Sequence, residues 1–214
     1  MKRSIQATSL LVIFLGGLMV ACPVFGQDMS FKIGLNRAST SGMQYTHDDG
    51  TTPVTNSDSA IGNEVFLEYL ISERFGLEIN SSVSPLKRTY TLESGGTVIS
   101  QNVIEEASYT LFGANLYFSK AGRKGLKFLV GLSAGTADIT HSFEGGTLGT
   151  DSSSNSTSVT VVKLGMDWIT KLAGFRFQYQ NWEGTASNTT QIAGVKQTGD
   201  MTGSVISLGV FAFF

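Results

Sequence analysis

The sequence predicts an all-β protein, an eight-stranded antiparallel up-and-down transmembrane β-barrel. Apolar and polar residues alternate in run after run, and no apolar stripe with a helical period persists. The segments between these runs are alternately short and long. Charged residues make up only 15% of the 214 residues, compared with about 25% in a typical soluble domain. After the first 25 residues, no segment approaches the roughly 20 apolar residues that a membrane helix needs.

The overall composition excludes several other classes. The chain has 25 glycines, 3 prolines and 1 cysteine, with a formal net charge of −2 and a mean hydropathy of +0.09. These values exclude collagen, a coiled coil and a disulfide scaffold. Nucleic-acid binding is not expected either, because the chain is not strongly basic and has no basic or aromatic stripe.

Residues 1–26 are predicted to be a cleavable signal peptide. Lys2 and Arg3 form a positive start, residues 10–21 form an apolar run too short to span a membrane, and residues 24–26 provide a cleavage site before Gln27. The remaining residues, 27–214, form the predicted barrel domain, which has 13 basic and 17 acidic side chains and no cysteine.

An alternative to this cleavage is a lipoprotein signal. Met19-Val20-Ala21-Cys22 loosely resembles a lipoprotein cleavage box. Cleavage after Gly26 is favoured because residues 24–26 offer a well-placed exit beyond Pro23.

Eight alternating runs account for the predicted strands. Most of them exceed the five or six residues usual in soluble sheets and match the 9–11 residues that cross a bilayer at a tilt. In the last run, Ile206, Leu208 and Val210 share one face. The predicted strands are residues 29–38, 61–71, a third that includes 75–80, 107–118, 126 to about 139, 157–170, a seventh that begins with 175–180, and 203–214.

The connections strengthen this interpretation. The three short turns are residues 72–74, 119–125 and 171–173, and the four long, polar loops are residues 39–60, 87–106, 140–156 and 184–202. Both termini then lie on the short-turn side. Outer-membrane barrels have this asymmetry, and lipid requires a closed barrel because no backbone group can be left unpaired.

The polar face is predicted to line the lumen and the apolar face to lie outside. A soluble barrel that binds apolar ligands would not tolerate so many inward charges, whereas four positive and four negative side chains can neutralise one another in a narrow lumen. The inward charges are Lys32, Glu64, Glu68, Glu78, Lys127, Lys163, Asp167 and Arg176.

Aromatic residues gather near both ends of the predicted strands, as in the interfacial girdles of membrane barrels. This distribution also places the apolar face outside. Those near the turns are Tyr69, Phe75, Phe118, Phe128, Trp168 and Phe175, and those near the loops are Tyr45, Tyr90, Phe143 and Trp182.

Residues 27–214 resemble the small eight-stranded outer-membrane proteins, which include OmpX and the membrane domain of OmpA. Strand count, loop asymmetry and the terminal run 206–214 carry the resemblance. It implies that Phe214 is read by the barrel-assembly machinery as an insertion signal. It also implies a monomer in the bacterial outer membrane, in contact with lipid and lipopolysaccharide, with periplasmic termini and extracellular loops that meet an unknown ligand.

No catalytic, cofactor-binding or metal-binding residue is assigned. Histidine is the residue type that could serve as a base near neutral pH, and the chain has two, His47 and His141; His141-Ser142 leaves open an interfacial lipid A acyl-modifying enzyme or lipase. The favoured interpretation is that both histidines are solvated loop residues. Residues 131–135 match G-x-S-x-G, but Ser133 lies in a predicted strand with no helix after it.

Two interpretations of the inward charges remain open. They either line a narrow path for ions or small solutes, or form a paired plug. The plug is favoured because side chains just fill the lumen of an eight-stranded barrel. The sequence thus predicts an integral outer-membrane protein with a structural or surface-interaction role, such as adhesion or envelope integrity.

Overall fold

The computed structural model describes residues 30–44, 46–48, 54–55, 59–93, 100–144, 151–171, 173–186, 189–192, 195–198 and 201–214. The predicted signal peptide and its lipoprotein alternative lie outside the described residues, as do Tyr45 and the side chains of His47, Tyr90 and Phe143. Within the described part of the chain, no helix is long and apolar enough to cross a membrane.

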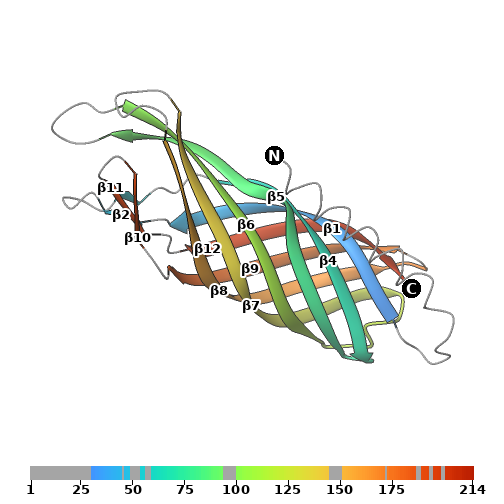
Figure 1. Cartoon of the computed structure of the whole chain (residues 1–214). Coiled ribbons are helices and arrows are strands. Elements are labelled where there is room, and N and C mark those ends of the chain that lie inside the picture. Colours follow the sequence, from blue (N-terminus) through green and yellow to red (C-terminus); the bar gives the residue numbers. More distant parts are fainter. Residues whose placement is uncertain are drawn as a thin grey trace, which may run out of the picture.

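Eight long strands close into one antiparallel barrel (Figure 1), which confirms the predicted fold class. Each strand pairs with its neighbour in sequence order, and β12 pairs with β1 to complete the wall. The strands are β1 (Ser30–Gln44), β4 (Ile61–Ser72), β5 (Phe75–Glu93), β6 (Ser100–Tyr117), β7 (Gly125–Glu144), β8 (Asp151–Ile169), β9 (Ala173–Ala186) and β12 (Met201–Phe213).

The two-residue alternation of the sequence determines which side chains face outward. On β8, Val162 and Leu164 are more than half exposed, whereas Lys163 between them is fully buried. Successive side chains of a strand point to opposite faces, and the same parity holds on β7 and β9. The apolar face is therefore the outside of the barrel and the polar face lines its interior.

Several strands are longer than the sequence predicts. The strands β5 to β8 have 18 to 20 residues each, about twice the 9–11 that cross a bilayer. Much of the expected long loops at 87–106 and 140–156 is therefore paired strand. The prediction was wrong because Ser, Thr and Asn show no apolar face in the sequence, although the inward side chains described there, Glu105, His141 and Asn155, are at most 5% exposed. In Figure 1 these strands extend beyond the others at one end.

The first and last long loops contain a second, small sheet. Its order is β10-β11-β2-β3, formed by β2 (Thr46–Asp48), β3 (Val54–Thr55), β10 (Thr189–Ile192) and β11 (Val195–Thr198). The pairing of β11 with β2 joins two loops that are about 150 residues apart in the chain. The sequence gives no periodic signal for strands this short.

An irregularity in the pairing of β5 leaves the two faces of the wall unchanged. Two consecutive register shifts between β4 and β5 fall at residues 82–87 of β5, and Pro85, which cannot donate to the ladder, lies within the second of them along the chain. Because two extra residues are inserted, Leu86 still points inward, like Glu78 below it. Gly62 lies against this bulge, where a Cβ atom would be 2.9 Å from three backbone atoms of β5.

The three short turns lie at one end of the barrel, where the sequence places them, and one of them docks onto another. The Ala121 N–H donates to the Glu73 carbonyl at 2.7 Å, and the Tyr117 N–H donates to the Arg74 carbonyl at 2.8 Å. Ala121 is fully buried in a small apolar cluster with Tyr117 and Leu129. Gly125 ends the same turn and begins β7, and its φ of 104° favours glycine.

Candidate functional site

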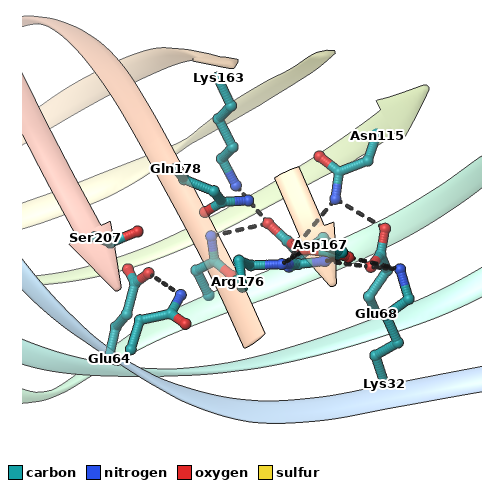
Figure 2. A network of polar contacts seen from close by, with 12 residues as sticks. Lys32, Glu64, Glu68, Asn115, Lys163, Asp167, Arg176, Gln178 and Ser207 are labelled. Atoms are coloured by element: carbon teal, nitrogen blue, oxygen red, sulfur yellow. Dashed lines mark hydrogen bonds and ion pairs between the residues drawn. The ribbon is translucent and has the colours of Figure 1, made fainter. Parts of the chain in front are cut away.

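Six charged side chains from five strands meet inside the barrel (Figure 2). Each of them is at most 2% exposed. They are three cations and three anions, so the group is neutral if all are ionised. We call this group the central cluster; it consists of Lys32, Glu68, Glu78, Lys163, Asp167 and Arg176.

Arg176 is the hub of the central cluster. Its Nε donates to Asp167 Oδ1 at 2.7 Å, and its Nη2 donates to Asp167 Oδ2 at 2.8 Å. The same Nη2 lies 2.7 Å from Glu68 Oε2, and Nη1 donates to Glu78. One planar guanidinium therefore binds three carboxylates, a pattern that a lysine ammonium cannot reproduce.

The two lysines complete the pairing. Lys32 Nζ lies 2.9 Å from Asp167 Oδ2 and 3.2 Å from Glu68 Oε2, and Lys163 Nζ donates to Glu78 Oε1 at 2.6 Å. Every carboxylate of the central cluster thus contacts at least two cations or strong donors. A buried ionic group is tolerated only when its partners are present in this way.

Neutral side chains add further hydrogen bonds to the central cluster. The Tyr117 hydroxyl donates to Glu68, with Oε2 at 2.7 Å, and accepts from Lys32 Nζ at 2.5 Å. Asn115 Nδ2 lies 2.9 Å from Glu68 Oε1 and 3.0 Å from Glu78 Oε2. These residues were not singled out from the sequence, although their position in the alternation places them on the polar face.

Aromatic rings pack against the cations of the cluster. Arg176 Cζ lies 4.1 Å from the Phe66 ring centroid and 5.7 Å from that of Phe211. Lys32 Nζ lies 4.1 Å from the centroid of Tyr117. These contacts are within the range of cation–π attraction, and the rings fill the space around the ion pairs.

Glu64 and Lys127, the other two predicted lumen charges, lie outside the central cluster. Glu64 accepts from Asn36 Nδ2 at 2.6 Å and from the Tyr109 hydroxyl at 2.7 Å. Lys127 is 8% exposed and stands opposite Asp167 in the β7–β8 register. All eight predicted positions therefore face the interior, and the structure brings six of them into one network.

The prediction that Trp182 belongs to a loop-side girdle is wrong. It is fully buried, packs edge-on against Tyr109 at 4.8 Å between centroids, and donates from Nε1 to Gln180 Oε1 at 2.9 Å. Its position follows from parity, because Arg176, Gln178 and Gln180 on the same strand also face inward. On the turn side, Phe118 and Trp168 are 63% and 60% exposed, as a girdle requires.

His141 is also not a solvated loop residue. It is 1% exposed, and its Nε2 lies 3.2 Å from Glu105 Oε2. Because neighbouring residues of a strand point to opposite faces, His141 and Ser142 do not face one another. Ser133 lies within β7, and no helix follows it in the described chain, so the nucleophile-elbow context is missing.

Taken together, the apolar outer wall, the charged and filled interior and the short turns at one end define a class. The chain has the fold of the small eight-stranded outer-membrane β-barrels. OprG, an outer-membrane protein from Pseudomonas aeruginosa, has a TM-score of 0.58 and 14% identity, covering 87% of this chain and 96% of that one. Ail, the attachment invasion locus protein of Yersinia pestis, was solved with the heparin analogue sucrose octasulfate. It has a TM-score of 0.51 and 11% identity, covering 88% of this chain and 100% of that one.

Comparisons of the sequence itself find no relative. No protein-family model matches the chain, and no curated protein matches it. At these identities the structural likeness concerns the fold alone.

Proposed function

We propose that the protein spans the bacterial outer membrane as a closed barrel and has a structural or surface-interaction role. The turns and termini face the periplasm, and the loops face the outside. The observation that carries this proposal is the pairing of an apolar outer wall with a lumen crossed by ion pairs. Such a molecule is built to be held in lipid and to present its loops, rather than to pass solutes.

The outer wall supports the membrane location. Large apolar side chains from all eight strands are exposed. Keeping apolar surface in water costs about 25 cal/mol of free energy per Å² relative to burying it. Acyl chains remove this penalty. Examples, one from each strand in chain order, are Leu35, Ile61, Ile79, Phe112, Leu132, Leu164, Phe175 and Leu208.

The lumen supports a plug rather than a channel. Arg176 on β9 and Glu78 on β5 come from strands four places apart in a ring of eight, so their ion pair spans the full width of the barrel. Lys32 on β1 reaches Asp167 on β8, three places away. An ion would have to break several buried pairs in order to pass.

The loop end supports a surface role. On the barrel wall, β4 pairs with β5 only as far as Ile61 and Lys87, while β5 continues to Glu93. Among the described residues, no strand pairs with this edge of β5 beyond Lys87. An open strand edge can accept another chain by main-chain hydrogen bonding. The proposed contact region for an extracellular ligand is therefore the paired part of β5 and β6 beyond Lys87, residues 88–93 and 100–105, which we call the projecting sheet.

The net charge of the loop segments indicates which kind of ligand they can bind. The segments 39–60, 87–106, 140–156 and 184–202 contain three basic and nine acidic residues. Ail was solved with a sulfated sugar, but a strongly anionic ligand would be repelled by this loop end. We therefore propose a neutral or basic partner for this protein. The other proposed contacts are outer-membrane lipid, lipopolysaccharide and, through Phe214, the barrel-assembly machinery.

Three measurements test the proposal. Unboiled protein in SDS should migrate differently from boiled protein, and identical mobility would contradict a stable membrane barrel. Planar-bilayer recording should give no stable, sizeable conductance, and such a conductance would contradict the plug.

Shortening the β5–β6 hairpin, by deleting residues 88–93 and 100–105 together with the tip between them, should weaken cell binding without changing the mobility shift. Unchanged binding would contradict a role for the projecting sheet.

A further inference from the structure

The turn end of the barrel carries a concentration of exposed cations. The three short turns, residues 72–74, 119–125 and 171–173, contain five basic side chains and one acidic side chain. The loop segments at the other end have the opposite balance. We call the four cations on the first two turns the basic turn surface; they are Arg74, Lys120, Arg123 and Lys124.

The fold holds these cations together by docking one turn onto the other. Two backbone hydrogen bonds, from Ala121 to Glu73 and from Tyr117 to Arg74, join the turns. Lys120 also pairs with Glu73 across the junction. That pair neutralises one cation, so Arg74, Arg123 and Lys124 form an excess of positive charge on an ordered surface.

A hollow of about 460 Å³ lies between the two turns. Ser72, Glu73, Lys120, Gly122 and Arg123 line its polar part, and Ile71 lines its apolar part.

The outer wall continues directly from this hollow. Ile71 is 53% exposed on that wall, Phe75 follows Arg74 directly in the chain, and Phe118 lies two residues before Lys120. Cations therefore lie within one or two residues of side chains that face the acyl region. A phospholipid has the same arrangement, with its phosphate at the edge of its acyl chains.

We propose that the basic turn surface binds the phosphate headgroups of anionic phospholipids in the leaflet that the turns face. This inference rests on the proposed insertion and orientation. Arginine guanidinium groups bind phosphate oxygens through paired donors, and clustered cations are attracted to anionic leaflets. Lipid is favoured over an acidic protein because the cations continue the lipid-facing wall instead of standing apart from it.

Quenching of tryptophan fluorescence by brominated lipids provides the test. The full chain would be reconstituted in phosphatidylcholine vesicles with increasing brominated phosphatidylglycerol, and quenching would report the lipid selected at the wall. Trp168 is the lipid-facing probe, whereas Trp182 is buried. The test variant is R74Q/R123Q/K124Q, which leaves the Lys120–Glu73 pair and the turn docking in place. The matched control is K87Q, because Lys87 is an exposed cation at the loop end.

The natural chain should prefer phosphatidylglycerol over phosphatidylcholine by about fivefold or more, because each cation that contacts an anionic lipid surface raises the affinity by about that factor. The triple variant should lose most of this preference, K87Q should keep it, and 0.5 M salt should reduce it. Equal preference in the triple variant and the natural chain would overturn the proposal. So would capture of an acidic protein that depends on the three cations while the lipid preference does not.

Insertion is checked separately in the same samples. Brominated phosphatidylcholine should quench Trp168, and unboiled protein should keep its shifted mobility. A chain that fails both checks contradicts the proposed function as well. An inserted chain without preference for phosphatidylglycerol contradicts only the lipid site.

Discussion

Asp167 and Arg176 stand directly opposite one another in the β8–β9 ladder, and their side chains form a two-point ion pair at 2.7 and 2.8 Å. They are nine residues apart, joined through one short turn, so a local hairpin is enough to form the pair. The guanidinium then has donors left for Glu68 and Glu78 on the far side of the lumen. A local contact thus orients the group that makes the long-range ones.

Replacing Arg176 with methionine should destabilise the barrel by about 3–5 kcal/mol, because three buried carboxylates lose a shared partner. R176K should fall between this variant and the natural chain, since it keeps the charge without the planar donors. Urea unfolding in lipid vesicles, followed by tryptophan fluorescence, measures both. If R176M unfolds at the same urea concentration as the natural chain, the cluster does not stabilise the barrel.

The sequence predicts the wall of the barrel well because its period is local. On β8, the alternation alone places Trp168 outside and Asp167 inside, and the structure agrees. Which charges meet across the lumen is not local. Arg176 and Glu78 are 98 residues apart, and their contact depends on how all eight strands are staggered around the ring.

The errors at the loop end have a related cause. The ends of β5 to β8 are rich in Ser and Thr and lack the apolar face that marks a strand in the sequence, so the sequence predicts loops there. Trp182 was assigned to a girdle from its place near a strand end. Counting in twos from Arg176 would have placed it inside the barrel.

The two tryptophans should respond in opposite ways to a quencher in the lipid. Trp168 is 60% exposed on the outer wall and Trp182 is fully buried in the lumen. Brominated phosphatidylcholine should therefore quench most of the emission of W182F, which retains Trp168, and little of the emission of W168F. Equal quenching of the two variants would place Trp182 at the outer wall, as the girdle prediction did.

Gly62→Ala should destabilise the barrel by about 1–3 kcal/mol. The added Cβ would lie 2.9 Å from Leu86 N, Pro85 O and Ser84 O, and backbone atoms in a ladder cannot move aside as a flexible side chain can. Gly125→Ala is the comparison, because its Cβ meets no atom within 4 Å and only the φ of 104° is unfavourable. That strain costs about 1–2 kcal/mol. Unfolding in urea compares them, and an unchanged midpoint for Gly62→Ala would exclude the tight packing at the bulge.

Glu73 should titrate at a lower pH than an ordinary glutamate. Its hydrogen bond with Lys120 lowers the pKa of this exposed carboxyl below 4.5. A lowered pKa in the folded state means that the contact stabilises the fold above pH 4.5 and that this contribution is lost as the pH falls through the folded value. The side-chain carbon shift of Glu73, followed by NMR from pH 7 to pH 2, should show this midpoint. In K120M it should return toward 4.5, and no difference between the two proteins would exclude the pair in solution.

Phe214 should matter for assembly in cells more than for stability. It is 52% exposed, and its contacts with Phe31 are two backbone hydrogen bonds of 3.0 and 2.9 Å, which an alanine would keep. Phe214→Ala should therefore refold into vesicles with little loss of stability, yet reach the outer membrane in smaller amounts. The neighbouring Phe213 serves as the control.

Phe213 packs against the buried cluster of Phe66 and Phe211, so Phe213→Ala should lower the free energy of unfolding by up to about 3 kcal/mol. The comparison uses urea unfolding for stability and the heat-shifted band in outer-membrane fractions for assembly. Because the two residues are adjacent, a general effect of altering the chain end would appear in both variants. An assembly signal at Phe214 requires the two variants to differ, with Phe214→Ala weaker in cells and Phe213→Ala weaker in urea. Equal assembly of Phe214→Ala and the natural chain would exclude that role.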